Sequence, residues 1–422
     1  MSELSYLEKL LDGVEVEWLP LGEVSALRRG RVMSKGYLTE NFGPYPVYSS
    51  QTANNGKIGS INTFDFDGEY ISWTTDGANA GTVFYRTGKF SITNVCGLIT
   101  LKSKYSLIYK FLFYWLTIEA KKHVYSGMGN PKLMSHQVEN IPVPIPCPDN
   151  PEKSLAIQSE IVRILDTFSA LTAELTAELT AELNMRKKQY NYYRDQLLSF
   201  DEEQEKPIYL EKLMDGVEVE WRTLGEIAVI YDGTHKTPKY TASGVPFVSV
   251  QNIKNLYGTN KYISPEDFKT YKNKPRKHDL FMTRIGDVGT CAIVEDDRPL
   301  AYYVTLALIR INQQIAVPGF IRYLIESRFG KAELYKRTLI HAVPMKINLG
   351  EIGKVAVPIP CPDNPEKSLA IQSEIVRILD KFDTLTNSIT EGLPREIELR
   401  QKQYEYYRNL LFSFPKPETV SN

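Results

Sequence analysis

The spacing of hydrophobic residues along the chain predicts two long helices. After residue 152, apolar side chains recur at alternating steps of four and three residues, at Ile157, Ile161, Ile164, Phe168, Leu171 and Leu175. This spacing is typical of a coiled-coil seam. A similar stretch begins at residue 366 and contains Gly392 and Pro394, where we expect a kink or a break. A proline-rich VPIPCPDNP segment precedes each stretch, so each helix must begin after it.

The two predicted helices belong to a frame of sequence that occurs twice. Residues 143–166 recur without change at 357–380, at an offset of 214. Residues 186–200 return in similar form at 400–414, at the same offset. The predicted helices therefore have equal lengths. They could pair antiparallel, which gives the chain a pseudo-two-fold arrangement.

Two dissimilar segments interrupt this frame. Residues 6–18 recur with one change at 209–221, but at an offset of 203. Between the repeats lie an insert at 25–142 and an insert at 228–356, which show no obvious similarity to each other. The pattern suggests one scaffold that carries two inserts, each of which recognises something different. An apolar segment near the end of each insert, at 106–122 and 318–336, is predicted to be helical and to close its domain.

Strand-like stretches in the second insert, at 245–255 and 280–294, add β-structure to the predicted helices. We therefore predict a mixed α/β fold, with two α/β domains separated by two long antiparallel coiled-coil helices. The predicted divisions are an N-terminal segment and first domain at 1–142, a first frame helix at 143–200, a second domain at 201–356, and a second frame helix with a C-terminal tail at 357–422.

A shorter repeat lies inside the first predicted helix. The sequence TAEL occurs three times in succession, and its leucines are Leu171, Leu175, Leu179 and Leu183. Each unit would lengthen a helix by about 6 Å at 1.5 Å per residue. This indicates a spacer in which the number of TAEL units sets the length of the helix. The alternative is a filler chosen for helix propensity, because Ala, Glu and Leu are strong helix formers.

Charge separates the inserts from the frame. The chain has 50 basic and 51 acidic residues, but the insert at 25–142 has 13 basic against 7 acidic residues. The insert at 228–356 has 19 against 11, which leaves a strongly acidic frame. Basic surfaces attract phosphate, and release of counterions makes such binding depend on salt. The distribution favours two nucleic-acid-binding faces on an acidic support.

The two-fold frame, the TAEL units and the proline-to-helix junctions resemble the specificity subunit of type I restriction–modification enzymes, and most closely its type IC group. The resemblance covers nearly the whole chain. It implies two target-recognition domains, each reading one half of a split sequence in double-stranded DNA. It also implies that the helical frame spaces these domains and docks two modification subunits.

The same resemblance assigns the chemistry to partner subunits. Modification subunits bind S-adenosylmethionine and methylate adenine N6, and the adenine is flipped out of the duplex into the partner's pocket. Restriction subunits use ATP and Mg for translocation and cleavage. The chain itself carries no phosphate loop, no GxGxxG and no [DNS]PP[YF] motif, and no histidine pair at metal-ligand spacing. We therefore expect a non-catalytic subunit that binds no metal or cofactor.

Basic and amide side chains in the inserts are the candidate DNA contacts, since Arg suits guanine and Gln or Asn suits adenine in the major groove. The candidates in the first insert are Arg28, Arg29, Arg31, Lys35, Ser50, Gln51, Asn54, Asn55 and Lys57. Those in the second insert are Thr234, His235, Lys236, Thr237, Lys239, Gln251, Asn252, Arg276, Lys277 and Arg284. Which of them contact bases rather than phosphates stays open.

Two further expectations concern the class of protein and its location. A self-sufficient DNA-binding regulator with two reading heads is the alternative to a specificity subunit, and it would bind tightly without partners. The sequence has no signal peptide, and its most apolar run, at 105–118, is interrupted by Lys110 and is too short to span a bilayer. We expect a cytoplasmic protein.

Overall fold

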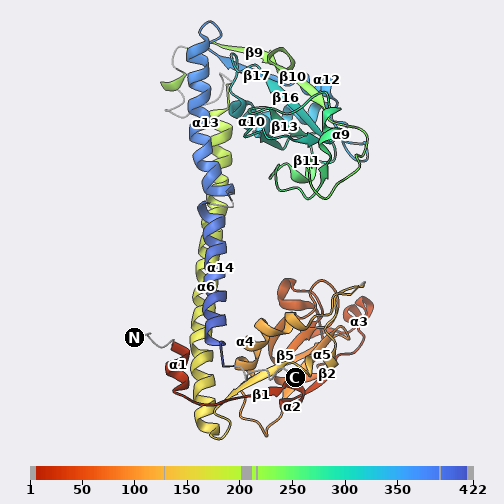
Figure 1. Ribbon diagram of the computed structural model, residues 1–422, viewed down its shortest axis with the longest axis vertical. Coiled ribbons are helices and arrows are strands. Elements are labelled where there is room, and N and C mark those ends of the chain that lie inside the picture. The colour runs from red at the N-terminus through yellow and green to blue at the C-terminus, as the bar shows by residue number, and fades with distance from the viewer. Residues whose placement is uncertain (1–5, 128, 201–211, 215–216, 389–390, 416–422) are drawn as a thin grey trace. The chain divides into compact units, whose positions relative to one another are not determined.

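The computed structural model describes residues 6–127, 129–200, 212–214, 217–388 and 391–415 (Figure 1). Contacts divide the chain into two compact units. Unit 1 comprises residues 1–177 and 398–422, and unit 2 comprises residues 178–397. Helix α6 (Pro151–Leu197) and helix α14 (Gly392–Leu411) therefore each contribute residues to both units.

Unit 1 is built around a six-stranded sheet. In spatial order its strands are β2 (Ser25–Arg29), β7 (Cys96–Leu101), β5 (Phe66–Thr74), β6 (Val83–Ile92), β3 (Phe42–Tyr48) and β4 (Lys57–Ile61). Most neighbours are antiparallel, but the end of β6 runs parallel to β3. Trp73 is the largest fully buried side chain here, and it requires Gly97 opposite, because a Cβ at Gly97 would lie 2.1 Å from the indole ring.

Several short helices and one longer helix also belong to unit 1. They are α1 (Tyr6–Leu11), α2 (Leu21–Val24), α3 (Lys35–Glu40), η1 (Ala53–Gly56), α4 (Tyr109–Glu119), η2 (Ala120–His123) and α5 (Ser135–Val138). Helix α4 packs on β5 and β6, and it buries Phe111, Leu112 and Trp115. The prediction of a closing helix in the first insert is confirmed.

Unit 2 has two small sheets in its insert. One has the strand order β10 (Ala228–Asp232), β16 (Leu306–Ile311), β13 (Leu280–Thr283) and β14 (Cys291–Ile293). The other has the order β12 (Tyr262–Ile263), β11 (Val245–Val248) and β15 (Ala301–Tyr302). Its helices are α8 (Leu224–Ile227), η3 (Val250–Asn252), α9 (Pro265–Lys269), α10 (Pro318–Glu326), α11 (Arg328–Arg337), α12 (Leu349–Gly353) and α13 (Pro365–Asn387).

The repeated frame sequence forms the same strand pair in both units. In unit 1, β1 (Val16–Pro20) pairs with β8 (Pro142–Pro146), and Val16 lies opposite Pro146. In unit 2, β9 (Val219–Thr223) pairs with β17 (Ala356–Pro360), and Val219 lies opposite Pro360. The register is identical. Each pair is an isolated two-stranded ribbon, so the prolines, which cannot donate to a ladder, lie on strand edges.

The frame helices bury one side against their own sheet domains. Ile157, Ile161 and Leu165 of α6 are buried in the core of unit 1. Their counterparts in α13, at an offset of 214, are Ile371, Ile375 and Leu379, which are buried in unit 2. Of the six predicted seam positions, Ile157 and Ile161 are buried, and Ile164, Phe168 and Leu175 are half-buried. The prediction is wrong at Leu171, which is 49% exposed. The buried stripe advances by fours because it packs on a domain rather than only on a partner helix.

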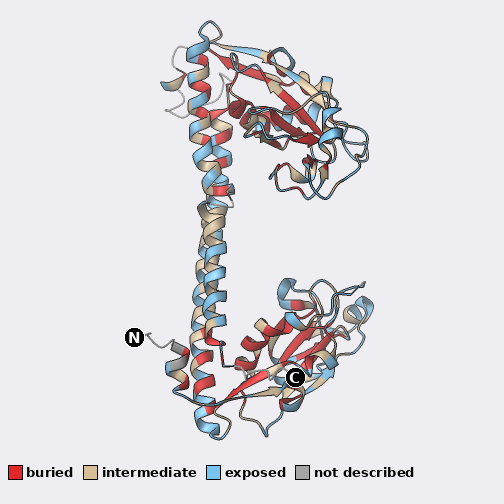
Figure 2. Cartoon of the chain, viewed as in Figure 1, coloured by how far each residue is buried: buried red, intermediate tan, exposed pale blue. Residues whose placement is uncertain are grey.

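The middle of α6 differs from its two ends in burial. Figure 2 shows buried residues near both ends of this helix, and no residue between 166 and 189 is buried. Of the four TAEL leucines, Leu175, Leu179 and Leu183 are half-buried. The predicted break in the second helix is confirmed, because α13 ends at Asn387 and α14 begins at Gly392, which has a φ of +75°.

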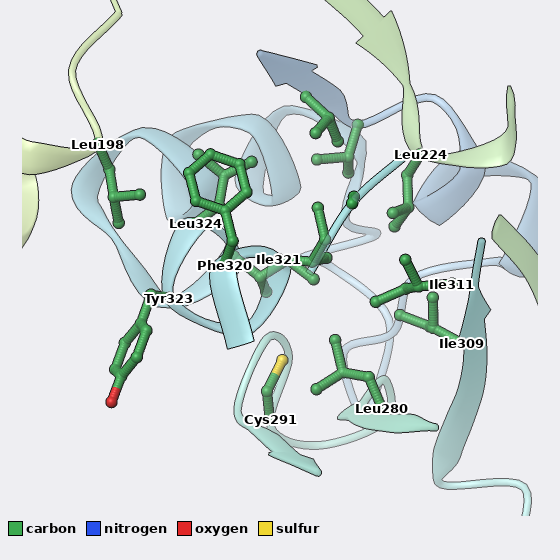
Figure 3. Close-up of a cluster of buried hydrophobic side chains, with 14 of the residues drawn as sticks. Leu198, Leu224, Leu280, Cys291, Ile309, Ile311, Phe320, Ile321, Tyr323 and Leu324 are labelled. Carbon is green, nitrogen blue, oxygen red and sulfur yellow. The ribbon is translucent and has the colours of Figure 1, made fainter. Parts of the chain in front are cut away.

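The last residues of each frame copy complete the core of a unit. Phe412 and Phe414 lie 5.2 and 6.1 Å from Phe111 between ring centroids, in unit 1. In unit 2 the corresponding residues are Leu198 and Phe200, and Phe200 lies 5.9 Å from Phe320. Figure 3 shows Leu198 in the same buried cluster as Phe320, Tyr323 and Leu324. Each unit thus combines an insert with the terminal residues of the other frame copy.

The structure confirms the predicted fold class, with two sheet-containing units and long helices packed on them. Within the described residues, no helix has the length and apolar character needed to cross a membrane.

Candidate nucleic-acid interface

The basic candidates of the first insert follow strand β2. Arg28 and Arg29 end this strand and are exposed. Arg29 donates to the Asn94 carbonyl at 3.3 Å and approaches Met134 Sδ at 3.2 Å. Arg31 pairs with Asp65 at 3.0 Å and contacts the Tyr37 hydroxyl at 3.1 Å. These contacts raise the pKa of Arg31, first through the hydrogen bond with Tyr37 and then through Asp65. The guanidinium groups of Arg29 and Arg31 are thus held in place, while both residues stay exposed.

Lys35 starts α3 and is exposed. The remaining candidates of this insert lie in the loop before β4, except Lys57, which is the first residue of β4. Asn54 and Asn55 have φ values of 50° and 53° there, in the left-handed region that Asn tolerates. Gln51 donates to the Lys57 carbonyl at 2.5 Å and so closes the loop. Ser50 and Lys57 are half-buried, whereas Gln51, Asn54 and Asn55 are exposed.

A buried arginine that the sequence analysis missed supports this loop. Arg86 is 3% exposed and donates to the Asn55 carbonyl at 2.9 Å and to Ser72 Oγ at 3.0 Å. Its guanidinium carbon lies 3.6 Å from the ring centroid of Tyr48. Burial lowers the pKa of Arg86 to about 10. Arg86 lies in the middle of a strand without a distinguishing motif, so no sequence signal marked it.

The candidates of the second insert gather in the loop after β10. Thr234 is half-buried, and His235, Lys236, Thr237 and Lys239 are exposed. His235 Nε2 lies 2.9 Å from Asp232 Oδ2. Beside this loop is a cavity of about 240 Å³, lined by Asp232, Gly233, Thr234, Thr270, Tyr271, Lys272, Asn273 and Tyr302. The cavity is thus lined both by the hydrogen-bonding groups of this loop and by the aromatic residues Tyr271 and Tyr302.

The other candidates of this insert occupy separate loops. Gln251 is exposed in η3, whereas Asn252 uses its Oδ1 to accept a hydrogen bond from the Ser249 amide at 3.1 Å. Arg276 and Lys277 are exposed just before β13. Asn252 therefore has a local structural bond, and Gln251, Arg276 and Lys277 point donors toward the surface.

Arg284 is the candidate that the structure places differently. It is 7% exposed and donates to Asp232 Oδ1 at 2.6 Å and to the Ile347 carbonyl at 3.2 Å. A further bond reaches the Val304 carbonyl at 3.3 Å. All of these contacts lie inside the domain. Arg284 thus anchors the Asp232 loop from within, because a buried arginine needs a carboxylate and carbonyl partners.

The first candidate loops of the two inserts occupy equivalent positions. Arg31 forms a parallel bridge with Thr93, and Thr234 forms a parallel bridge with Tyr303. The preceding residue is glycine in both, because a Cβ at Gly30 would lie 2.1 Å from the Ile92 carbonyl oxygen and one at Gly233 would lie 2.5 Å from the Tyr303 carbonyl oxygen. Arg-Gly-Arg in unit 1 therefore corresponds to Asp-Gly-Thr in unit 2.

The inserts also attach to the frame helices in the same way. The fully buried Gln158 accepts from the Ile108 amide at 2.9 Å and donates to the Ser106 carbonyl at 2.7 Å. Gln372 forms the same pair of bonds with the Val317 amide at 2.9 Å and the Ile315 carbonyl at 3.0 Å.

A tyrosine completes each attachment. Tyr114 donates to Asp166 at 2.8 Å, and Tyr323 donates to Asp380 at 2.6 Å. This correspondence is hidden in the sequence, because the matching residues of the two inserts lie at an offset of 209 rather than 203 or 214.

Comparisons with known proteins agree with this duplicated architecture. A protein-family model described as the type I restriction modification DNA specificity domain matches residues 13–185 and 216–399. The chain belongs to this family. It is similar to the EcoR124I/EcoR124II specificity subunit of Escherichia coli, at 40% identity over 460 aligned residues that cover all of both chains. The EcoprrI specificity subunit of Escherichia coli is 38% identical, over 93% of each chain.

A solved structure supports the fold of this specificity subunit. It was determined to study complex assembly and conformational transition of the type I R-M system, and it matches with a TM-score of 0.60 over 94% of this chain and 97% of that chain. Its sequence is 14% identical, so the likeness concerns the fold alone. Within the part of the chain that the structure describes, no cluster of three or more His, Cys, Asp or Glu residues could hold a metal ion.

Proposed function

We propose that each unit of this DNA specificity subunit reads one half of a split sequence in double-stranded DNA. One observation carries this proposal: the two units repeat the same frame contacts while equivalent surface positions differ in chemistry. Arg29 and Arg31 of unit 1 correspond to Asp232 and Thr234 of unit 2. Arginine suits guanine. At the equivalent place in unit 2, both oxygens of Asp232 are held by Arg284 and His235, which leaves the hydroxyl of Thr234 as the available group. The two half-sites should therefore differ.

The candidates divide into groups by their supporting contacts. In unit 1, Arg28, Arg29 and Arg31 lie on or next to a strand end, which supports base contact because strand ends are held rigidly. In unit 2, the loop from Thr234 to Lys239 has the corresponding place. Lys35, Lys57 and Lys277 carry charges that suit phosphate. Arg284 has a positioning role, because its donors are engaged within the domain.

The frame is the proposed docking site for two modification subunits, which would supply S-adenosylmethionine-dependent methylation of adenine N6. Each frame copy exposes a pair of adjacent tyrosines whose rings pack edge to face. The pair Tyr192 and Tyr193 has ring centroids 5.5 Å apart, and the pair Tyr406 and Tyr407 has them 5.3 Å apart. Exposed aromatic residues are enriched at protein interfaces. Restriction subunits would add ATP- and Mg-dependent cleavage.

The TAEL segment is proposed to set the number of base pairs between the half-sites. It lies in the stretch of α6 that buries no residue, so its length can change without altering either core. Removing residues 172–175 would shorten the helix by about 6 Å, which corresponds to one or two base pairs at 3.4 Å each. We expect a shorter spacer between unchanged half-sites.

The proposal is tested by mapping adenine methylation across the genome of cells that express this chain with a compatible modification subunit. One split motif, methylated on both strands and lost without this chain, is the expected result. Exchange of residues 228–356 for another insert should then change one half-site alone. Changes in both halves would contradict independent reading, and tight selective binding by the chain without partners would favour a self-sufficient regulator.

A further inference from the structure

The structural repeat extends further into the inserts than the sequence repeat indicates. Glu119 is 6% exposed and pairs with Lys122 at 2.7 Å and with His123 at 3.4 Å. At an offset of 214, Glu333 is 8% exposed and pairs with Lys336 at 2.9 Å and with Arg337 at 2.9 Å. The same buried carboxylate thus fixes the end of a helical segment in each unit.

A hairpin follows this carboxylate in both units. The amides and carbonyls of Tyr125 and Lys132 exchange hydrogen bonds of 2.9 and 3.0 Å. Leu339 and Lys346 exchange the corresponding bonds at 2.8 and 3.4 Å. The two hairpins therefore begin and end at equivalent residues, again at an offset of 214.

Each hairpin is also joined to a glycine-containing loop. In unit 1, Gly77 donates to the Pro131 carbonyl at 3.0 Å, and Lys132 bridges to Asp76. In unit 2, Gly286 donates to the Met345 carbonyl at 2.8 Å, and Lys346 bridges to Ile285. The backbone thus presents the final lysine of both hairpins in the same setting.

The side chains of the two hairpins differ everywhere except at that lysine. Residues 125–131 read YSGMGNP and residues 339–345 read LIHAVPM, and both sequences are followed by lysine. Lys132 and Lys346 are exposed, and among the described residues neither ammonium group has an acidic partner within ion-pair distance. An ion pair within the described part of either domain therefore does not account for the cation that ends both hairpins.

We propose that Lys132 and Lys346 anchor the DNA backbone, with each ammonium group contacting one phosphate of its half-site. Phosphate contacts position a protein on DNA and carry no sequence information, whereas base contacts specify the sequence. Two readers of different half-sites therefore need different base-contacting residues but can share a phosphate contact. This inference rests on the proposed function of the two units as DNA readers.

The test measures the salt dependence of DNA binding by the full chain in complex with a compatible modification subunit. Its probes are a fluorescein-labelled duplex of mixed sequence and a pool of random-sequence duplexes, from which bound DNA is sequenced. The variants are Lys132→Gln, Lys346→Gln and the double variant. The charge-preserving variants Lys132→Arg and Lys346→Arg are the first controls. Lys331→Gln is the second, because Lys331 is exposed and its equivalent in unit 1 is Thr117.

Each Gln variant should reduce the slope of log K against log salt by about 0.9, and the double variant by about twice that. The selected half-sites should stay unchanged, and the Arg variants should keep the wild-type slope. Unchanged slopes in the Gln variants would overturn the inference, as would a changed base at one position of a half-site. If the wild-type complex selects no split sequence, the proposed function itself fails. If it selects one and the Gln variants match it, only the lysine inference fails.

Discussion

Replacing Gln372 by leucine tests how strongly the second insert depends on its frame helix. Gln372 is fully buried. Its side-chain oxygen accepts a hydrogen bond from the Val317 backbone amide, and its side-chain nitrogen donates to the Ile315 carbonyl and to Ser368 Oγ. Val317 is the N-cap of α10 and has no side-chain cap of its own, so Gln372 supplies a hydrogen bond that the start of this helix requires. Leucine has a similar size but can neither donate nor accept.

The expected cost follows from the groups that would lose their partner. A buried donor or acceptor left without a hydrogen bond costs about 1–3 kcal/mol. Two main-chain groups are affected, and apolar packing by leucine offsets part of the loss, so we expect unit 2 to lose about 2–4 kcal/mol. At about 1.4 kcal/mol per tenfold change, local opening of α10 should increase roughly thirtyfold to several hundredfold.

Hydrogen exchange followed by mass spectrometry reads this change in each unit separately. Peptides from α10 of the Gln372→Leu variant should exchange faster, while peptides from α4 stay as in the wild type. Gln158→Leu should give the opposite result, because Gln158 serves α4. Gln313→Leu is the surface control, since Gln313 is exposed near the same insert segment. Unchanged α10 exchange in Gln372→Leu, or equal acceleration in both units, would refute the reasoning.

Three further outcomes follow from single side chains. Gly97→Ala should destabilise unit 1 by about 1–3 kcal/mol in chemical denaturation, because its Cβ would overlap the buried Trp73 ring, whereas Gly36→Ala should have little effect. Burial raises the pKa of Tyr190 to about 12. The stability that its protonated hydroxyl contributes should therefore be complete below pH 10 and lost between pH 10 and 12. In Tyr190→Phe, the free energy of unfolding should depend less on pH in that window. Arg284→Met should destabilise unit 2 by about 2–4 kcal/mol, because the Asp232 carboxylate and two carbonyls lose their donor. In bound-DNA sequencing it should weaken recognition of the whole half-site, and loss at a single base would instead indicate direct contact.

The sequence predicted the frame well because its signals are local. Hydrophobic spacing, prolines and letter-for-letter repeats were enough to predict α6, α13 and the break before Gly392. The equivalence of the inserts was harder to see, since matching residues lie at offsets of 203 near Gly30, 209 near Tyr114 and 214 near Glu119. Loops of different length cause these shifts, and side-chain identity survives only at positions such as Tyr114 and Tyr323.

For the candidate interface, the sequence predicted which residue types occur but not which individual residues reach the surface. Sequence identifies basic and amide residues in an insert, but it does not show which of them the fold buries. Arg284 and Arg86 illustrate this limit, because both are buried arginines that support a loop from below. Lys132 and Lys346 illustrate the converse, since their importance emerges only when the two hairpins are compared as structures.

Each unit is completed by the last residues of the other frame copy. A fragment that contains only one frame copy should therefore lack part of its core. A fragment of residues 1–200 contains the insert of unit 1 but lacks Phe412 and Phe414, which pack on Phe111. Its own equivalents, Leu198 and Phe200, follow the end of α6. They cannot reach the same core, because the helix from Leu165 to Leu197 is about 48 Å long at 1.5 Å per residue.

A second copy of the fragment can supply what the first lacks. The segments 186–200 and 400–414 are similar in sequence, so the end of one copy should close the core of the other, in the place that 400–414 occupies in the full chain. We therefore expect the fragment to form a dimer in light scattering coupled to size exclusion, and to select the same half-site twice when modification subunits are added. Replacing both Leu198 and Phe200 by alanine should weaken the dimer, whereas alanine at the exposed Asn191 should not. A stable monomer with a protected α4 would show that the terminal residues are dispensable, and the view of each unit as a composite of two frame copies would then be wrong.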